Sequence, residues 1–171
     1  MELIIRQALV EDLERLDEIE QICFPPKEAA SHDTLESRLK VYGRSFQLAE
    51  LDGKIIGFIN GSIINDMVIH DEHYGDTSYH DANGAYQSIF GLCMLPEYRK
   101  SGYASALVNA LINTAEDSGR KGLTLCCKEE KISYYEKLGF VNHGKSASDH
   151  GSAVWYNMIL KLNEGTPSPV D

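Results

Sequence analysis

In the stretch "PEYRKSGYASALVNAL", residues 96–111, a polar loop runs directly into a helix with apolar periodicity. The start of a helix leaves its first N–H groups without partners inside the helix. A bound anion could accept hydrogen bonds from these groups, and so could water or a capping hydroxyl. The junction combines two cations with a glycine and several small residues: Arg99, Lys100, Ser101, Gly102, Tyr103, Ala104 and Ser105.

The neighbouring segments place this junction inside a β-α-β unit. We expect a strand over 85–94, a helix over 102–118 and a strand over 122–127. Phosphate groups bind where the carboxyl end of a strand meets a helix N-terminus, and Gly102 would let the backbone approach such a ligand closely. Gly91 predicts a bulge that would splay its strand from the neighbouring strand. On these residues alone, Gly102 can equally belong to an ordinary turn, because neither a Walker loop nor a dinucleotide-binding glycine pattern is present.

Helices and strands alternate along the rest of the chain, which predicts a single α/β domain with a mixed sheet over residues 1–162. The polar residues 163–171 have the composition of a flexible tail. The remaining elements are expected to be a strand over 3–9, helices over 9–23 and 31–42, a hairpin over 45–64, a long loop over 66–84, a short helix over 128–139, and strands over 140–147 and 152–161.

The bulk composition is that of an ordinary globular protein and excludes several functional classes. The chain has 171 residues, of which 43% are hydrophobic and 25% charged. Its formal net charge of −10 argues against a nucleic-acid partner, which would need a basic face. No apolar run is long enough for a membrane span, and the amino terminus lacks the regions of a signal peptide. We therefore expect a cytoplasmic protein with four reduced cysteines and no membrane partner.

Two motifs resemble those of a known family. "RKSGYA", residues 99–104, matches the R/Q-x-x-G-x-G/A signature of the acetyl-CoA pyrophosphate loop in the GNAT superfamily of N-acetyltransferases. Downstream, "ISYYEKLGF", residues 132–140, resembles the "FYEKLGF" segment of the same family. The resemblance covers residues 1–162 and implies a mixed, mostly antiparallel, twisted sheet flanked by helices, with a splayed central strand pair.

Three further segments resemble one branch of that superfamily. "CFPPKEAASHDTLESRL", "IIGFINGSI" and "LCCKEEKISYYEKLGF" are similar to the serotonin (arylalkylamine) N-acetyltransferases and their bacterial relatives. This implies transfer of the acetyl group of acetyl-CoA to a small primary amine by direct attack in a ternary complex, without a metal. The partners would be acetyl-CoA and the amine, and the chain a monomer or homodimer. An acceptor amine on a peptide or protein, and a non-catalytic acyl-CoA sensor or scaffold, remain as alternatives.

The resemblance also implies roles for individual residues. The backbone amides of residues 100–105 would hold the pyrophosphate, and Arg99 and Lys100 would add positive charge. Tyr135 matches the tyrosine beside the thioester sulfur and would act as the general acid, although on its own it reads as an ordinary amphipathic aromatic. Its neighbour Tyr134 would pack or line the cofactor. The strand end that would bind the pantetheine arm and border the acyl group consists of Leu92, Cys93 and Met94.

One departure from the family pattern concerns the general base. The animal enzymes carry two histidines at spacing i, i+2 on this strand, and the matching residues here are Ser88 and Phe90. Neither side chain can accept a proton near pH 7. Ser88 could take part in a water-mediated proton relay, and we expect Glu28 and Phe90 to contact the substrate. The base itself stays unassigned.

Two other chemistries have residues that could support them. The loop around His70 and His80 holds enough ligands for zinc, but it lacks a fixed ligand motif, so we expect a solvated loop and no metal. The ligand candidates are His70, Asp71, Glu72, His73, His80 and Asp81. Cys93 could form an acyl-enzyme, although a thiol on a buried strand is the simpler expectation.

Overall fold

The structure is a computed structural model that describes residues 2–148 and 150–162. The flexible tail expected for residues 163–171 lies outside the described residues, so it stays a prediction. Within the described part of the chain, no helix is both long enough and apolar enough to cross a membrane.

The strands form two sheets, and the chain passes from one sheet to the other. The first contains β1 (Leu3–Gln7), β2 (Phe46–Leu51), β3 (Lys54–Asn60) and β6 (Gly91–Met94), all antiparallel to their neighbours. The second runs β4 (Ile63–Ile64), β5 (Tyr86–Ile89), β7 (Gly122–Cys127), β9 (Tyr156–Lys161) and β8 (Val141–Lys145). Only β5 and β7 are parallel among these described pairs. The expected single α/β domain with a mixed, mostly antiparallel sheet is therefore confirmed.

The expected strand over 85–94 is in fact two strands in different sheets. β5 ends at Ile89 and β6 begins at Gly91, so the prediction of one bulged strand was wrong. At the break, the N–H of Phe90 donates to the carbonyl of Asn60 at 2.7 Å. The segment after β3 and the strand β5 approach each other closely here. This approach requires a glycine at Gly61, because a Cβ there would overlap the carbonyl oxygen of Ser88. The chain turns from one sheet into the other at this point.

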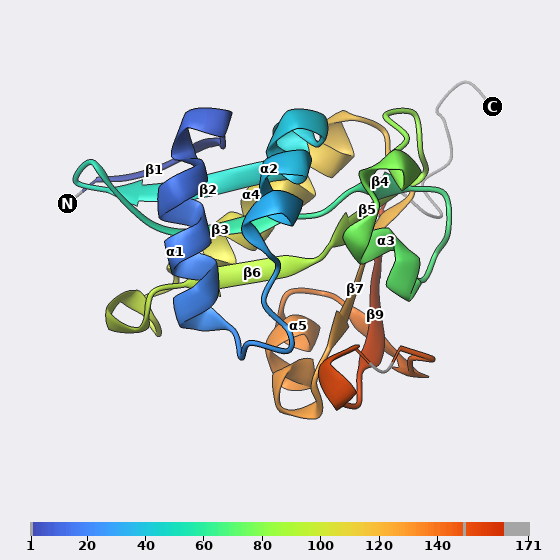
Figure 1. Ribbon diagram of the computed structural model, residues 1–171. Coiled ribbons are helices and arrows are strands. Elements are labelled where there is room, and N and C mark those ends of the chain that lie inside the picture. The colour runs from blue at the N-terminus through green and yellow to red at the C-terminus, as the bar shows by residue number, and fades with distance from the viewer. Residues whose placement is uncertain (1, 149, 163–171) are drawn as a thin grey trace, which may run out of the picture.

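Helices cover both faces of the first sheet (Figure 1). α1 (Leu13–Cys23) and α2 (His32–Val41) lie on one face, and α4 (Tyr103–Asp117) lies on the other. Two buried clusters hold these layers together, since apolar burial is the main stabilising contribution. The α1–α2 side includes Leu16, Ile19, Leu35, Phe46 and Phe58. The α4 side includes Ile59, Leu107, Leu111, Leu123 and Leu125.

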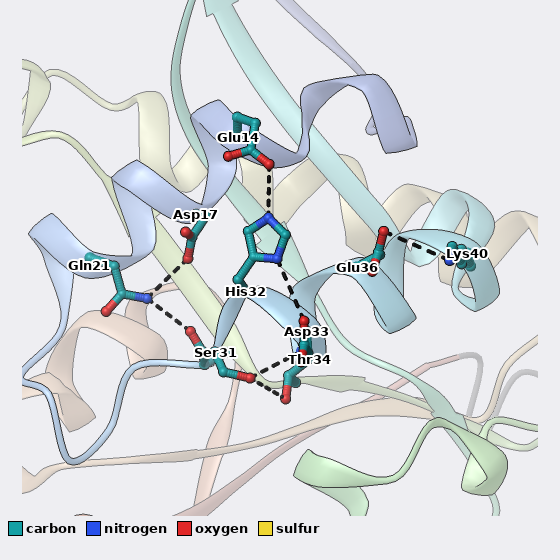
Figure 2. A network of polar contacts seen from close by, with 10 residues as sticks. Glu14, Asp17, Gln21, Ser31, His32, Asp33, Thr34, Glu36 and Lys40 are labelled. Carbon is teal, nitrogen blue, oxygen red and sulfur yellow. Dashed lines mark hydrogen bonds and ion pairs between the residues drawn. The ribbon is translucent and has the colours of Figure 1, made fainter.

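Polar contacts on the outer surface tie α1 to α2 (Figure 2). Ser31 caps α2 by accepting a hydrogen bond from the Thr34 N–H at 3.1 Å, as its position before the helix predicts. His32 Nε2 lies 2.8 Å from Glu14 Oε1, and this carboxylate raises the pKa of His32. Both side chains are largely exposed to solvent, so the pair contributes little to stability.

The region expected to be an irregular loop, residues 66–84, contains short helical pieces. α3 (Asp71–Gly75) begins where the His70 N–H donates to His73 Nδ1 at 2.9 Å. Such local side-chain bonds form turns without hydrophobic periodicity, which is why the sequence pattern missed them. The remaining elements are α5 (Ile132–Lys137) and 3-10 segments at Val10–Asp12, Gly43–Ser45, Thr77–Tyr79, Pro96–Tyr98, Glu129–Lys131 and His150–Ser152, the last of which replaces the start of the strand expected over 152–161.

Candidate functional site

β6 and β7 diverge at their carboxyl ends. The ladder between β5 and β7 ends at the pair Ile89 and Leu125. Beyond it, β6 pairs with β3, and Cys126 and Cys127 of β7 pair with β9. No ladder joins β6 to β7 among the described residues, and Figure 1 shows the two strands running in different directions. This is the splayed strand pair that the family resemblance implied.

The loop before α4 has an open, left-handed backbone. Lys100 has φ +65° and Gly102, the N-cap of α4, has φ +85°. A Cβ on Gly102 would meet nothing within 4 Å, and both residues are exposed. Glycine offers no capping side chain, so the first N–H groups of α4 have no cap within the loop. These amides and the positive end of the helix dipole suit an anion.

Two side-chain contacts fix this loop to its neighbours. The Arg99 Nε donates to the carbonyl of Met94 at 2.8 Å, which anchors the loop to the end of β6. Ser105 and Tyr134 share a hydrogen bond of 2.9 Å between their hydroxyls, which joins α4 to α5. Tyr134 thus lies beside the loop. One guanidinium nitrogen of Arg99 is already engaged by the protein, a detail that sequence reasoning missed.

Tyr135 belongs to the buried cluster that also contains Met94 of β6 and Cys127 of β7. Its side chain is 8% exposed, and its ring meets Phe140 edge-on with the centroids 5.8 Å apart. Burial raises the pKa of the Tyr135 phenol well above its ordinary value, with Tyr134, Cys127 and Cys93 adding to the effect. Cys93 belongs to β6 and Cys127 to β7. The phenol is therefore protonated at neutral pH, as a proton donor must be.

Two cysteines near the end of β6 have opposite acidities. Burial raises the pKa of Cys93 well above its ordinary value, and its thiol points to Glu20 Oε1 at 3.6 Å. Cys23, at the end of α1, is only half-buried, and a hydrogen bond with Cys93 is the main cause that lowers its pKa to about 6. Arg99 lowers the pKa of Cys23 further. The geometry therefore gives no support to Cys93 as a nucleophile.

Four aromatic side chains form a row beside the strand break, which we call the aromatic row: Phe90, Tyr74, His150 and Trp155. The Phe90 and Tyr74 rings have centroids 4.7 Å apart, and Tyr74 stacks on His150 at 5.6 Å with 8° between the planes. His150 then meets Trp155 at 6.1 Å. Of these four, sequence reasoning singled out only Phe90, because the other three lie in segments without periodicity.

An ion pair closes one end of the aromatic row. Lys128 Nζ lies 2.8 Å from Glu28 Oε2 and 5.6 Å from the centre of the Trp155 ring. The Glu28 side chain is only 10% exposed, and the ammonium group of Lys128 balances the charge of its carboxylate. His150 Nε2 donates to the Glu28 carbonyl at 3.3 Å, because a carbonyl can only accept. These contacts join the segment between α1 and α2 to the end of β7 and the loop before β9.

The other expected polar residues are engaged inside the protein. Ser88 is 0% exposed and donates to the Ser62 carbonyl at 2.7 Å, so the geometry does not favour a proton relay through it. In the loop around His70 and His80, His73 Nδ1 accepts from the His70 N–H and His80 Nδ1 from the Ile63 N–H. The described residues contain no group of three or more histidine, cysteine or acidic side chains arranged to hold a metal.

Comparison with known proteins gives one family match and several relatives. The sequence model of the Acetyltransferase (GNAT) family matches residues 13–140. The uncharacterized N-acetyltransferase YkwB of Bacillus subtilis (strain 168) is 27% identical over 126 residues, which cover 67% of this chain and 56% of YkwB. The chain spans about half the length of the curated relatives it matches.

Solved structures with low sequence identity have the same fold. The GNAT-like decarboxylase GphF, in complex with isobutyryl-CoA, has a TM-score of 0.80 at 19% identity over 92% of this chain and 98% of that chain. Arabidopsis thaliana Naa50, in complex with the bisubstrate analogue CoA-Ac-MVNAL, has a TM-score of 0.75 at 15% identity over 95% of this chain and 100% of that chain. The fold, the splayed strands and the family match agree, and the chain belongs to the acetyltransferase (GNAT) family.

Proposed function

We propose that this protein transfers the acetyl group of acetyl-CoA to a small primary amine by direct attack in a ternary complex. The observation that carries the proposal is the divergence of β6 and β7 between an exposed helix N-terminus and a buried tyrosine. An extended acyl-CoA can run along such a divergence, with its phosphates at the helix and its thioester at the tyrosine.

The acyl donor would be held mostly by backbone groups. The amides of residues 100–105 would bind the pyrophosphate, helped by the exposed charges of Arg99 and Lys100. The unpaired side of β6, which includes Leu92, Cys93 and Met94, would hydrogen-bond the pantetheine arm. Membership of the acetyltransferase family and the left-handed backbone at Gly102 support this assignment.

The proton balance of the reaction requires one donor and one exit route. The neutral amine forms a C–N bond with the thioester carbonyl, and the C–S bond breaks. Tyr135 would donate its phenolic proton to the departing thiolate and regain one from solvent, and the acetylated nitrogen would release its extra proton to solvent. An alkylamine with a pKa of about 10.4 is neutral roughly once in 10³ molecules at pH 7, so deprotonation has to precede attack.

The aromatic row favours an arylalkylamine as acceptor. Its four half-buried rings could stack on an aryl group or attract an ammonium ion before it loses its proton. The resemblance to the arylalkylamine branch supports the same class. Phe90 would contact the ring, and Glu28, already paired with Lys128, would position the surrounding segment instead of binding the amine directly.

A screen of acceptors tests the proposal. Thiol release from acetyl-CoA should be stimulated most by arylalkylamines, less by aliphatic polyamines and least by peptides with free amino termini. A preference for peptides would mean that the acceptor is a peptide amine and not a small amine. The fold shared with Naa50 is the reason to include peptides in the screen. No stimulation by any amine would contradict the proposal.

A second candidate function is a non-catalytic acyl-CoA sensor. The observation that favours it is the presence of Ser88 and Phe90 where the animal enzymes carry histidines. It predicts tight acetyl-CoA binding in calorimetry together with no amine-dependent thiol release. The buried position of Tyr135 favours the enzyme.

A further inference from the structure

A cavity with two arginines in its lining lies at the opposite end of α4 from the proposed phosphate loop. Its volume is about 130 Å³, whereas a single water needs only about 10–15 Å³ by the same measure. It is lined by the 3-10 segment Gly43–Ser45, the loop after His80, and the last turn of α4 with Arg120. α4 has 15 residues and is therefore about 22 Å long, so the two sites are separate.

Positive charge gathers around this cavity, although the protein as a whole carries a net charge of −10. Arg44 and Arg120 both line it, and among the described residues neither forms an ion pair. Burial and the charge of Arg44 lower the pKa of Arg120, which means that the two cations repel each other. Asp81 is the acid near Arg120, and its oxygens accept from Asn65 and Asn83.

One donor of Arg120, a residue that lines the cavity, has no acceptor among the described residues. The Arg120 Nη1 donates to the Gly84 carbonyl at 2.7 Å, but its Nε is buried without a partner among the described residues. A buried N–H of a charged group is costly to leave unsatisfied. The C-terminal end of a helix accounts for nearby cations. The helix end does not explain the unpartnered Nε–H of Arg120, because this guanidinium donates to Gly84, which lies outside α4.

His80 adds a second donor in a fixed orientation. Its Nδ1 accepts from the Ile63 N–H at 3.0 Å, so in the neutral ring the proton is on Nε2. Burial and Arg120 lower the pKa of His80, which keeps the ring neutral near pH 7. The ring stacks on Tyr42 with the centroids 5.3 Å apart.

We propose that this cavity binds a small oxyanion, a phosphate or a carboxylate, between Arg44, Arg120 and His80. Such an anion would offset the repulsion between the two arginines and form charge-assisted hydrogen bonds with their guanidinium groups. The proposal does not depend on the acetyltransferase activity.

Titration calorimetry and thermal melts of the full chain test this site, with inorganic phosphate and malonate as separate probes and chloride at equal ionic strength as the reference. We expect at least one probe to bind saturably and to raise the melting temperature, and the better probe identifies the ligand class. Arg120→Gln and Arg44→Gln should each weaken binding about tenfold. Arg44 is exposed, so its variant should fold even if Arg120→Gln does not.

Two control variants separate this cavity from general charge and from the phosphate loop. Lys121→Gln removes an exposed cation next to Arg120 that does not line the cavity, and Lys100→Gln removes one from the loop before α4. Both should leave binding unchanged. Equal loss in either control, or no probe binding above chloride, would overturn the proposal.

Discussion

Tyr135 combines a buried, protonated phenol with a position in the same buried cluster as residues of both diverging strands, β6 and β7. Its pKa is raised by burial, and its nearest ionisable neighbours are Tyr134 and the thiols of Cys127 and Cys93. A group that keeps its proton up to high pH cannot serve as a base. In a site that must release a thiolate, it can serve as the acid.

Replacing Tyr135 by Phe should lower kcat on the order of 10²-fold, the usual scale for a lost general acid, with little change in acetyl-CoA affinity. The phenyl ring keeps the packing against Phe140, so the melting temperature should stay close to that of the wild type. Tyr79→Phe, which changes a phenol that is 46% exposed, is the matched control. Turnover within about twofold of wild type in thiol-release assays would make Tyr135 a packing residue.

Cys23 should be the first cysteine to react with iodoacetamide at pH 7, because its pKa of about 6 leaves most of it as thiolate. Cys93 and Cys127 are buried and have raised pKa values, so they should react only on unfolding. Peptide mapping after brief alkylation identifies the labelled residue. Labelling of all four cysteines at equal rates would show that the hydrogen bond with Cys93 and the charge of Arg99 do not act on Cys23 in solution.

At the scale of elements, the start of α4 depends on backbone conformation more than on any side chain. Lys100 and Gly102 both have positive φ, which turns successive N–H groups outward. A substitution at Gly102 therefore strains the backbone and also fills the open space in front of the helix.

Gly102→Glu should abolish acetyl-CoA binding in calorimetry, because the new carboxylate would occupy the proposed pyrophosphate position. Gly119→Glu is a close control, since Gly119 also has a positive φ of 73°, an open surround and a place at the other end of α4. The two variants should lose similar stability in thermal melts, but only Gly102→Glu should lose the cofactor. Unchanged affinity in a folded Gly102→Glu protein would remove the loop assignment.

Elements with strong periodicity or capping signals could be predicted from the sequence, and the short polar ones could not. α4, the β2–β3 hairpin and the Ser31 cap all follow from local patterns. α3 begins at a hydrogen bond that the His70 N–H donates to the His73 side chain, and the break at Phe90 depends on contacts with a segment about thirty residues earlier. Neither leaves a periodic trace in the sequence.

The candidate site divides in the same way. The loop before α4 and Tyr135 stand in contiguous motifs, so the sequence could point to them. The aromatic row is assembled from three separate segments, because His150 and Trp155 share the loop before β9. Lys128 reaches Glu28 across 100 residues of sequence. The sequence also could not predict that the Ser88 hydroxyl is buried and donates to the Ser62 carbonyl, because both depend on the pairing of distant segments.

At the scale of the whole molecule, the pH dependence of the reaction should follow the acceptor. Only the neutral amine attacks, so kcat/KM should rise with pH toward the pKa of the amine and should not level near the ordinary histidine value of about 6.5. The raised pKa of Tyr135 means that no falling limb should appear below about pH 10. Two amines of different pKa serve as mutual controls, because the inflection should move with the amine. A plateau between pH 6 and 7 for both would instead indicate an unidentified base on the protein.

The most direct test of acetyl transfer is the ratio of N-acetylated amine to CoA thiol in a single reaction, measured by mass spectrometry and a thiol reagent. Transfer by direct attack predicts one acetylated amine for each thiol released, with both signals falling together in Tyr135→Phe. Thiol release without acetylated amine would mean that water, and not an amine, attacks the thioester. Binding of acetyl-CoA without formation of either product would contradict the acetyltransferase activity and would support the non-catalytic acyl-CoA sensor.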